Sequence, residues 1–213
     1  MIPVLYSCDD YIIIDKPSGL ATQPGEGVSV CVLDAVERDF GFKPYLVHRL
    51  DKETAGCLVV ARSSRAAAEL SAFMGGGGAV KTYRAVVSGQ PEPAHGVFSA
   101  TVRVKDRLLK AETHYRTLST DGRLSLVEAT LGTGRNHQIR QHFAQAGYPV
   151  IGDDRHGDFK LNKILAKEFG AKRLLLYACY LRLPLNPPVE AHSSVPPHIA
   201  AFLERWGRGG EPC

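Results

Sequence analysis

Short apolar runs, each closed by turn-forming residues, are the feature that most constrains how this chain can fold. The run Tyr11 to Asp15 ends at Lys16-Pro17-Ser18-Gly19, a pattern typical of a buried strand entering a turn. Gly56 to Ala61 has the same character, and so does Leu174 to Leu183, which prolines stop. Lys81 to Val87 alternates as a half-buried strand does. The chain is therefore expected to be rich in short strands.

Two segments have helical periodicity instead. Between Ser64 and Met74 apolar residues recur near helical spacing, and the glycines Gly75 to Gly78 predict the end of that helix and a flexible loop. After Gly134 the pattern predicts an amphipathic helix that ends at Gly147. The apolar face of this helix is expected to carry Ile139, Phe143 and Ala146. A polar edge on another face is expected to carry Arg135, Gln138 and His142.

Strands outnumber helices in this pattern and do not alternate regularly with them. The segments Thr113 to Leu118 and Leu124 to Ala129 flank Asp121-Gly122, a dipeptide favoured in hairpin turns. The sequence thus favours an α+β fold with a mixed, largely antiparallel sheet flanked by helices and loops. No repeat or Pro/Ser-rich linker divides the chain, so residues 1–213 are expected to form a single domain, with 205–213 as a frayed tail.

Composition narrows the class of protein. The chain has 26 Lys and Arg against 22 Asp and Glu, a formal charge of +4, which is compatible with a polyanionic partner. Its five cysteines are scattered, without the close pairs of zinc sites, and we expect reduced thiols. No apolar run approaches the roughly 20 residues that cross a bilayer, and the first residues lack a basic leader region. We expect a cytoplasmic protein that does not associate with membranes.

The densest chemical signal is His48-Arg49-Leu50-Asp51-Lys52-Glu53-Thr54-Ala55-Gly56. It places one carboxylate among cationic side chains and a histidine, directly before an apolar strand. Cations close in space would lower the pKa of Asp51 and keep it ionised as a nucleophile. A solvated turn with a local ion pair is the alternative interpretation.

A second signal runs from Gly132 to His142. Its two glycines allow close approach of the backbone, and Arg135 and Arg140 lie near the start of the expected helix. Cations there oppose the helix dipole unless an anion is held against them. A buried carboxylate or an RNA phosphate would supply that anion, and the alternative is that both arginines lie in solvent.

Four blocks in the same order resemble the RluA family of RNA pseudouridine synthases. The resemblance runs from about residue 5 to about residue 190, and four ordered blocks are far more specific than any one. The blocks are Ile14-Asp15-Lys16-Pro17-Ser18-Gly19-Leu20, His48-Arg49-Leu50-Asp51 with Thr54 and Gly56, Lys81-Thr82-Tyr83-Arg84-Ala85, and Thr133-Gly134-Arg135-Asn136-His137-Gln138-Ile139-Arg140 with Gly147 to Asp153.

The resemblance implies the pseudouridine synthase catalytic fold and roles for particular residues. Asp51 matches the catalytic nucleophile, and Arg135 matches the arginine that pairs with it. Tyr83 matches the ring that packs on the target uracil, and Arg49 the side chain that enters the RNA stack. The remaining candidates for substrate binding in these blocks are His48, Lys81, Gln138 and Arg140.

The same resemblance implies an isomerase that needs no cofactor or metal and acts on RNA. Because the first block starts near residue 11, we expect no room for the N-terminal S4 module that many relatives carry, and we expect a monomer. The segment Gly152 to Asp158, followed by Lys160, Lys163 and Lys167, is similar to relatives acting on large-subunit ribosomal RNA. Ribosomal RNA is therefore favoured as substrate, and transfer RNA stays possible.

Two rival interpretations stay open. A metal-dependent hydrolase would need ligands from His137, His142, Asp153, Asp154 and His156. Two histidines five positions apart on a helix point roughly 140° apart, which disfavours a shared ion. A catalytically impaired RNA-binding protein derived from a synthase is the other rival, because Ala55, Tyr177 and Asn186 replace the serine and histidines usual in the family.

Overall fold

A computed structural model describes residues 1–76 and 78–207. The fold is α+β with largely antiparallel strand pairing, as predicted. The described chain divides into two compact units. Unit 1 comprises Met1–Lys81 and Ala178–Ser194, and unit 2 comprises Thr82–Tyr177 together with the chain from Val195 on. The expectation of one domain over 1–213 stays a prediction.

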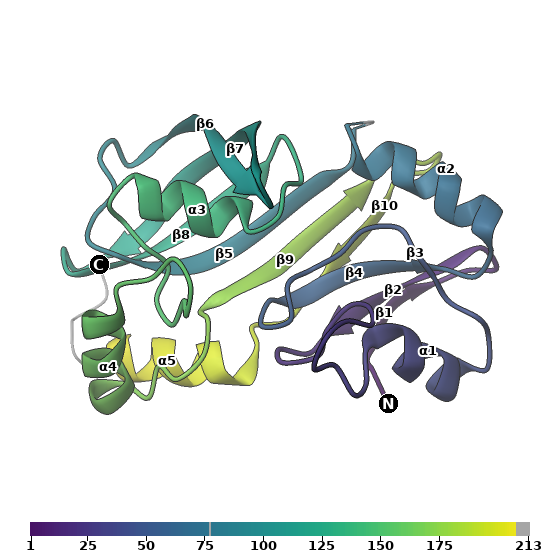
Figure 1. Ribbon diagram of the computed structural model, residues 1–213, viewed down its shortest axis with the longest axis horizontal. Helices are drawn as coiled ribbons and strands as arrows, with labels where there is room; N and C mark the ends of the chain where they lie inside the picture. Colours follow the sequence, from purple (N-terminus) through teal and green to yellow (C-terminus); the bar gives the residue numbers. More distant parts are fainter. Residues whose placement is uncertain (77, 208–213) are drawn as a thin grey trace. The chain divides into compact units, whose positions relative to one another are not determined.

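Unit 1 is built on the strands β1 (Val4–Ser7), β2 (Tyr11–Lys16) and β4 (Ala55–Ala61), which pair antiparallel in that order (Figure 1). β9 (Leu176–Leu183) is the next neighbour of β4. The short strands β3 (Tyr45–Leu46) and β10 (Val189–His192) pair with β4 and β9, respectively. The helices of this unit are α1 (Val32–Phe40) and α2 (Ser64–Met74).

The sheet of unit 1 is buried on both faces, which explains its continuous apolar runs. All seven residues of β4 are buried, and so are the first four of β2. Alternate residues of these strands, such as Ile13 and Val59, pack with Leu70 and Met74 of α2 in one hydrophobic core. Gly56 has a φ of 111°, and a Cβ there would lie 2.2 Å from the carbonyl oxygen of Ala178, so only glycine fits.

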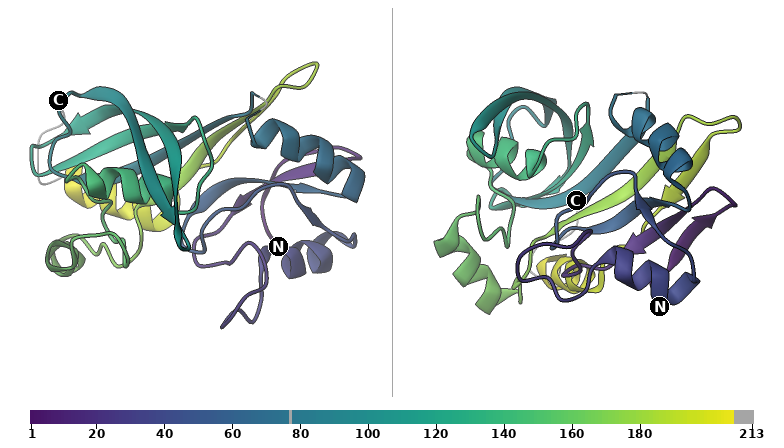
Figure 2. Two further views of the ribbon diagram at one scale, coloured as in Figure 1. Left: turned by 45° about the horizontal axis from the view of Figure 1, so that its top comes forward. Right: turned by 45° about the vertical axis from the view of Figure 1, so that its right-hand side comes forward.

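Unit 2 is built on an antiparallel sheet of β5 (Val80–Ser88), β8 (Leu124–Leu131), β7 (Arg107–Thr120) and β6 (His95–Val104) in that spatial order, in which β6, β7 and β8 form a meander. Asp121-Gly122 connects β7 to β8, as its turn chemistry predicted. α3 (Gln138–Gln145) lies against β6 and β7, and α4 (Phe159–Glu168) and α5 (Pro197–Gly207) complete the unit (Figures 1 and 2).

Aromatic packing anchors α3 to this meander. Phe143 is fully buried, and its ring meets Phe98 of β6 edge-on at 5.1 Å and Tyr115 of β7 at 5.7 Å between centroids. Phe98 and Tyr115 stack on one another at 4.4 Å. Edge-to-face and offset contacts of this kind contribute about 1 kcal/mol each beyond burial. The second half of α3 is thereby fixed against β6 and β7.

Several sequence predictions are confirmed and two are wrong. The strands expected at 11–15, 56–61, 81–87 and 174–183 and the helix at 64–74 are present, with ends shifted by at most two residues. The polar edge expected for α3 is wrong for Gln138 and His142, which are buried and hydrogen-bonded inside the protein, whereas Arg135 lies before α3 and is exposed. The frayed tail is wrong for 205–207, since α5 extends to Gly207 and the Trp206 indole donates to Asp121. The rest of that tail, like part of the expected glycine loop, lies outside the described residues.

Among the described residues, none of the helices combines the length and apolar character needed to span a bilayer.

Candidate active site

Asp51 lies in the loop between β3 and β4, and the residue before it is fixed by a buried threonine. Thr22 Oγ1 donates to the Leu50 carbonyl at 2.7 Å and accepts from the Leu50 amide at 3.2 Å. Leu50 itself is buried, whereas Asp51 is half-buried. The Asp51 carbonyl closes a turn by accepting from the Thr54 amide at 3.1 Å. The backbone that carries the carboxylate is thus held on both sides.

A buried lysine ties the same loop to the segment after β2. The Lys16 ammonium is fully buried and donates to the carbonyls of Pro17, Leu20 and Lys52 at 2.9, 2.8 and 3.0 Å. Burial lowers the pKa of Lys16 to about 7, and the carboxylates of Glu53 and Asp51 act in the opposite direction. Lys16 therefore anchors the loop that carries Asp51 through three main-chain hydrogen bonds.

Two further bonds close the contact between the loop after β2 and the loop before β4. The Gly19 amide donates to Lys52 O at 2.9 Å, and Ser18 Oγ donates to Glu53 O at 2.8 Å. The two sequence blocks Ile14 to Leu20 and His48 to Gly56 are therefore one structural element. Their order in the sequence gave no sign of this cross-bonding.

His48 and Arg49 differ in their surroundings. The His48 ring is half-buried, and its Nε2 accepts from the Val59 amide of β4 at 3.0 Å. Burial, and secondarily the Lys81 ammonium, lowers the pKa of His48 to about 3. A neutral ring bonded to the main chain favours a supporting role over the substrate contact predicted for it. Arg49 is exposed and accessible to a ligand.

Lys81 is not the accessible cation that the sequence suggested. Its side chain is buried, and Nζ donates to the Met74 carbonyl at the end of α2 at 2.7 Å. Burial also lowers the pKa of this ammonium. The buried ammonium thus satisfies a helix-terminal carbonyl, and this corrects the prediction of a direct substrate contact.

In unit 2, Tyr83 lies on β5 opposite Ala129 of β8 and is 7% exposed. The neighbouring pair Thr82 and Thr130 brings its hydroxyls to 3.3 Å on the other face of the same ladder. The ring is thus held by a paired strand in the interior of the sheet.

Arg135 lies in the loop before α3 and is exposed. The loop is organised by Gln138, which is 3% exposed. Gln138 Oε1 accepts from Thr133 Oγ1 at 2.7 Å and from the Arg135 amide at 3.0 Å, and Nε2 donates to Glu112 O and Thr113 Oγ1. Since both ends of this amide are engaged inside the protein, Gln138 positions the loop, in place of the substrate contact predicted for it.

Arg140 is likewise a buried structural residue. Its guanidinium is 5% exposed and makes a two-point ion pair with Asp153, with both N–O distances at 2.7 Å, and it reaches Asp154 at 3.1 Å. Burial raises the pKa of Asp153, but the hydrogen bonds from Arg140 and two backbone amides outweigh it and leave that pKa below its usual range. The anion expected against Arg140 is thus a buried carboxylate, which favours a structural role, and the RNA contact predicted for this side chain stays a prediction.

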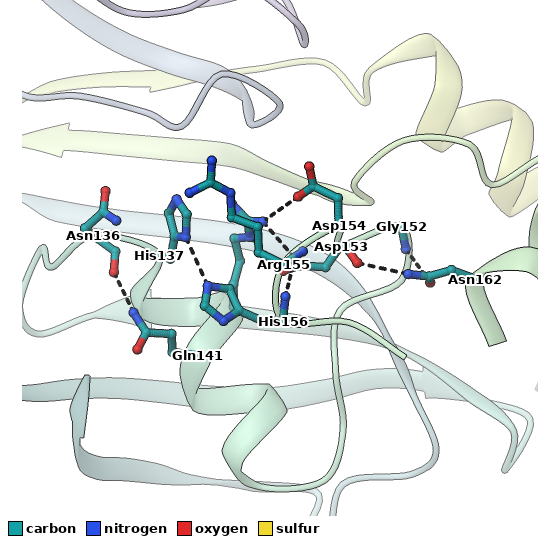
Figure 3. A network of polar contacts seen from close by, with 10 residues as sticks. Asn136, His137, Gln141, Gly152, Asp153, Asp154, Arg155, His156 and Asn162 are labelled. Carbon is teal, nitrogen blue, oxygen red and sulfur yellow. Dashed lines mark hydrogen bonds and ion pairs between the residues drawn. The ribbon is translucent and has the colours of Figure 1, made fainter. Parts of the chain in front are cut away.

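The residues of the rival metal site are used otherwise (Figure 3). His137 Nδ1 and His156 Nε2 share a hydrogen bond at 3.0 Å, and His142 Nδ1 bonds Thr113 Oγ1 of β7 at 2.9 Å. Within 1–76 and 78–207 no three His, Cys, Asp or Glu side chains group as metal ligands do. The hydrolase interpretation lacks a ligand cluster in the described chain.

The three predicted catalytic residues do not belong to one unit. Asp51 lies in unit 1, and Tyr83 and Arg135 lie in unit 2. Their predicted meeting around a uridine stays a prediction. The sequence analysis missed Thr22, Thr113 and the His137–His156 pair. Their contacts join residues far apart along the chain, so no local sequence pattern indicates them.

Comparison with known proteins decides the family. The family model described as RNA pseudouridylate synthase matches residues 10–145, which include Asp51, Tyr83 and Arg135. The chain belongs to the RNA pseudouridylate synthase family. Members of this family are isomerases that convert uridine to pseudouridine in RNA, and the resemblance noted in the sequence is confirmed.

Relatives of this synthase carry names with two kinds of substrate. It is 33% identical to tRNA pseudouridine synthase C of Yersinia pestis, over 91% of this chain and 84% of the relative. It is 32% identical to ribosomal large subunit pseudouridine synthase C of Vibrio cholerae, over 89% of this chain but only 66% of that relative.

Among solved structures, human RNA pseudouridylate synthase domain containing 4 matches with a TM-score of 0.83 and 26% identity, covering 95% of this chain and 92% of the human one. The predicted pseudouridine synthase fold is therefore confirmed.

Proposed function

We propose that this synthase isomerises specific uridines in structured RNA, with Asp51 as the nucleophile. The observation that carries the proposal is the Asp51 loop, which buried Lys16 and Thr22 tie to the segment after β2. A carboxylate on a backbone held this firmly fits a nucleophile that must keep its position.

In this proposal the isomerisation of uridine needs no external reactant. The bond between ribose C1′ and uracil N1 breaks with help from the Asp51 carboxylate, the uracil rotates, and C1′ bonds to C5. The proton on C5 leaves, and N1 gains one. In this scheme Arg135 neutralises the carboxylate when the pocket is closed to water, and Tyr83 stacks on the uracil, which contributes roughly 1–3 kcal/mol.

A uridine within a folded RNA hides its glycosidic carbon, so the base must be flipped at a cost of a few kcal/mol. Arg49 is exposed and long enough to fill the vacated position while it contacts phosphates. This assigns Arg49 to substrate binding and leaves the half-buried His48 and the buried Lys81, Gln138 and Arg140 to support the site.

We favour ribosomal RNA as substrate over transfer RNA, on the strength of the lysines of α4. Lys160, Lys163 and Lys167 are exposed and follow i, i+3, i+7, so they share one helix face. An extended cationic face suits a large folded RNA with many accessible phosphates.

The experiment uses purified protein and bulk RNA from a strain lacking this synthase, with pseudouridine mapped by a chemistry that blocks reverse transcription at that base. Ribosomal and transfer RNA are tested separately. We expect product in ribosomal RNA with the unchanged protein. Asp51→Asn should abolish product and keep RNA affinity nearly intact, because phosphate contacts carry most of the binding.

Glu53→Gln is the matched control, since it removes a neighbouring carboxylate that also acts on Lys16. Its product yield should stay close to that of the unchanged protein. Full activity of Asp51→Asn would sink the mechanism. Product in transfer RNA alone would overturn the preference for ribosomal RNA, and RNA binding without product would favour the impaired RNA-binding protein.

A further inference from the structure

The turn at residues 152–158, which follows α3, is joined by one side-chain contact to α3 and by another to the loop that carries Arg135. Arg140 of α3 forms the buried ion pair with Asp153, and Asp153 Oδ1 also accepts from the amides of Arg155 and His156 at 2.8 and 2.9 Å. These bonds fix the backbone of His156. The His156 ring then reaches His137, the residue directly before α3 (Figure 3).

His137 occupies a backbone conformation that needs support. Its φ of 53° and ψ of 25° are left-handed, and apart from glycine only Lys105 and His137 have positive φ in the described chain. A single residue held in this region costs on the order of 1 kcal/mol, which its surroundings must offset. The contact with His156, at 3.0 Å between ring nitrogens and with the rings edge-on at 5.3 Å, supplies such support.

From this geometry we infer that His156 is a positioning residue, which holds His137 and through it the Arg135 loop in the conformation needed for turnover, and releases it when both rings are protonated. The inference rests on the proposed role of Arg135. Arg135 is two residues before His137, and its amide is already tied to Gln138 at the start of α3.

The pH dependence follows from counting protons. A hydrogen bond between Nδ1 and Nε2 needs one protonated and one bare nitrogen, and a single additional proton elsewhere on the pair preserves it. Protonation of both facing nitrogens removes the acceptor and places two cations in contact. The two rings titrate as a coupled pair, so the hydrogen bond between them is lost only when the pair binds its second additional proton.

Other charged groups lie on the segments that carry this pair, and their effects must be separated from those of the pair. Arg140 comes from α3, Asp153, Asp154 and Arg155 come from the turn, and Arg135 comes from the loop. Asp153 stays ionised because Arg140 and two amides hold its pKa down. On β7, His114 bonds Glu112 at 2.8 Å close to the same loop, so this histidine needs a control of its own.

Glutamine and leucine at position 156 separate the hydrogen bond from the charge. The amide of His156→Gln stands in for Nε2 and can donate or accept, so the bond survives at every pH. His156→Leu removes the bond and keeps comparable bulk. His114→Gln is the control for the other histidine. Circular dichroism establishes that each variant folds.

Turnover is measured with saturating RNA from about pH 8 down to about pH 5.5, across the range where histidines ordinarily titrate. At the alkaline end we expect His156→Gln to match the unchanged protein. His156→Leu should lose kcat by about tenfold with KM changed by less than about twofold, since the loop acts on turnover more than on binding. On acidification the unchanged protein and His114→Gln should lose activity, and His156→Gln should lose clearly less.

Imidazole nitrogen NMR gives a readout that does not depend on activity. The bonded Nδ1 and Nε2 signals of the pair should be present at the alkaline end and change together on acidification. If His156→Leu keeps full kcat, or if His156→Gln keeps the acid loss, the inference is overturned. If no form of the protein makes pseudouridine, the proposed function fails, and the NMR titration still decides whether the pair opens.

Discussion

At the scale of the residue, His48 shows how burial converts a histidine into a fixed acceptor. Its pKa lies near 3, because burial and Lys81 disfavour the imidazolium, whereas the unfolded chain titrates at roughly 6.5. Between these values the unfolded state binds more protons, so stability falls as pH falls. We expect this residue to remove about 2 kcal/mol of unfolding free energy between about pH 7 and pH 5.

His48→Gln tests this, because the amide oxygen can accept from the Val59 amide and carries no titrating proton. Urea unfolding at several pH values should show a smaller acid loss for His48→Gln than for the unchanged protein. His95→Gln, at an exposed position, should leave the acid loss as it is. Equal slopes for His48→Gln and the unchanged protein would mean that His48 is not buried as a neutral ring.

The four sequence blocks and their resemblance identified the family but could not separate functional from structural cations. Asp51, Arg49 and Arg135 are accessible enough to keep the roles predicted for them. Lys81 and Arg140 are cations like Arg49 and Arg135, but Lys81 is buried against a carbonyl and Arg140 against a carboxylate. Since each partner is brought in by the folded chain, neither pairing leaves a local pattern in the sequence.

At the scale of the element, α4 presents a basic face. Lys160, Lys163 and Lys167 fall within an arc of roughly 60° on the helix, and the exposed Phe159 and Ile164 flank that arc. If this face contacts RNA phosphates, neutralising it should reduce the salt dependence of binding. For the triple change of these lysines to glutamine we expect the negative slope of log affinity against log salt to become shallower by roughly 2 to 3.

The matched control removes three charges elsewhere, by changing Lys105, Arg107 and Lys110 of the β6–β7 hairpin to glutamine. Affinity for a structured RNA is measured over a series of salt concentrations. A slope change of the same size in both triple variants would show that α4 has no special part in binding.

Elements were predicted where burial is continuous or periodic and missed where it is not. β2 and β4 were found because both of their faces are buried. β6 was missed because its residues are mostly exposed, which leaves no apolar alternation to detect. α1 was missed because it begins after Cys31, an unusual N-cap residue, where the Asp34 carboxylate accepts the Cys31 amide at 2.8 Å.

At the scale of the whole molecule, the chain passes from one unit to the other three times, after Lys81, Tyr177 and Ser194. Neither unit is a continuous stretch, and unit 1 is complete only once β10 has followed unit 2 along the chain. Local sequence patterns do not reveal this, because the returning strand β9 reads as one more apolar run. Such connectivity favours folding and unfolding in one step, as the prediction of a single domain requires.

Gly56→Ala tests that prediction. The new Cβ would meet the Ala178 carbonyl in unit 1, at a φ that side chains rarely adopt, so we expect a loss of about 3 kcal/mol or more in the free energy of unfolding.

The single tryptophan, Trp206, reports on unit 2, and modification of the buried Cys57 thiol reports on unit 1. In urea both probes should shift to the same lower midpoint, whereas Gly25→Ala, where a Cβ meets only Val28 at 3.9 Å, should leave both in place. A lower midpoint by Cys57 with an unchanged Trp206 transition would establish two domains that unfold independently.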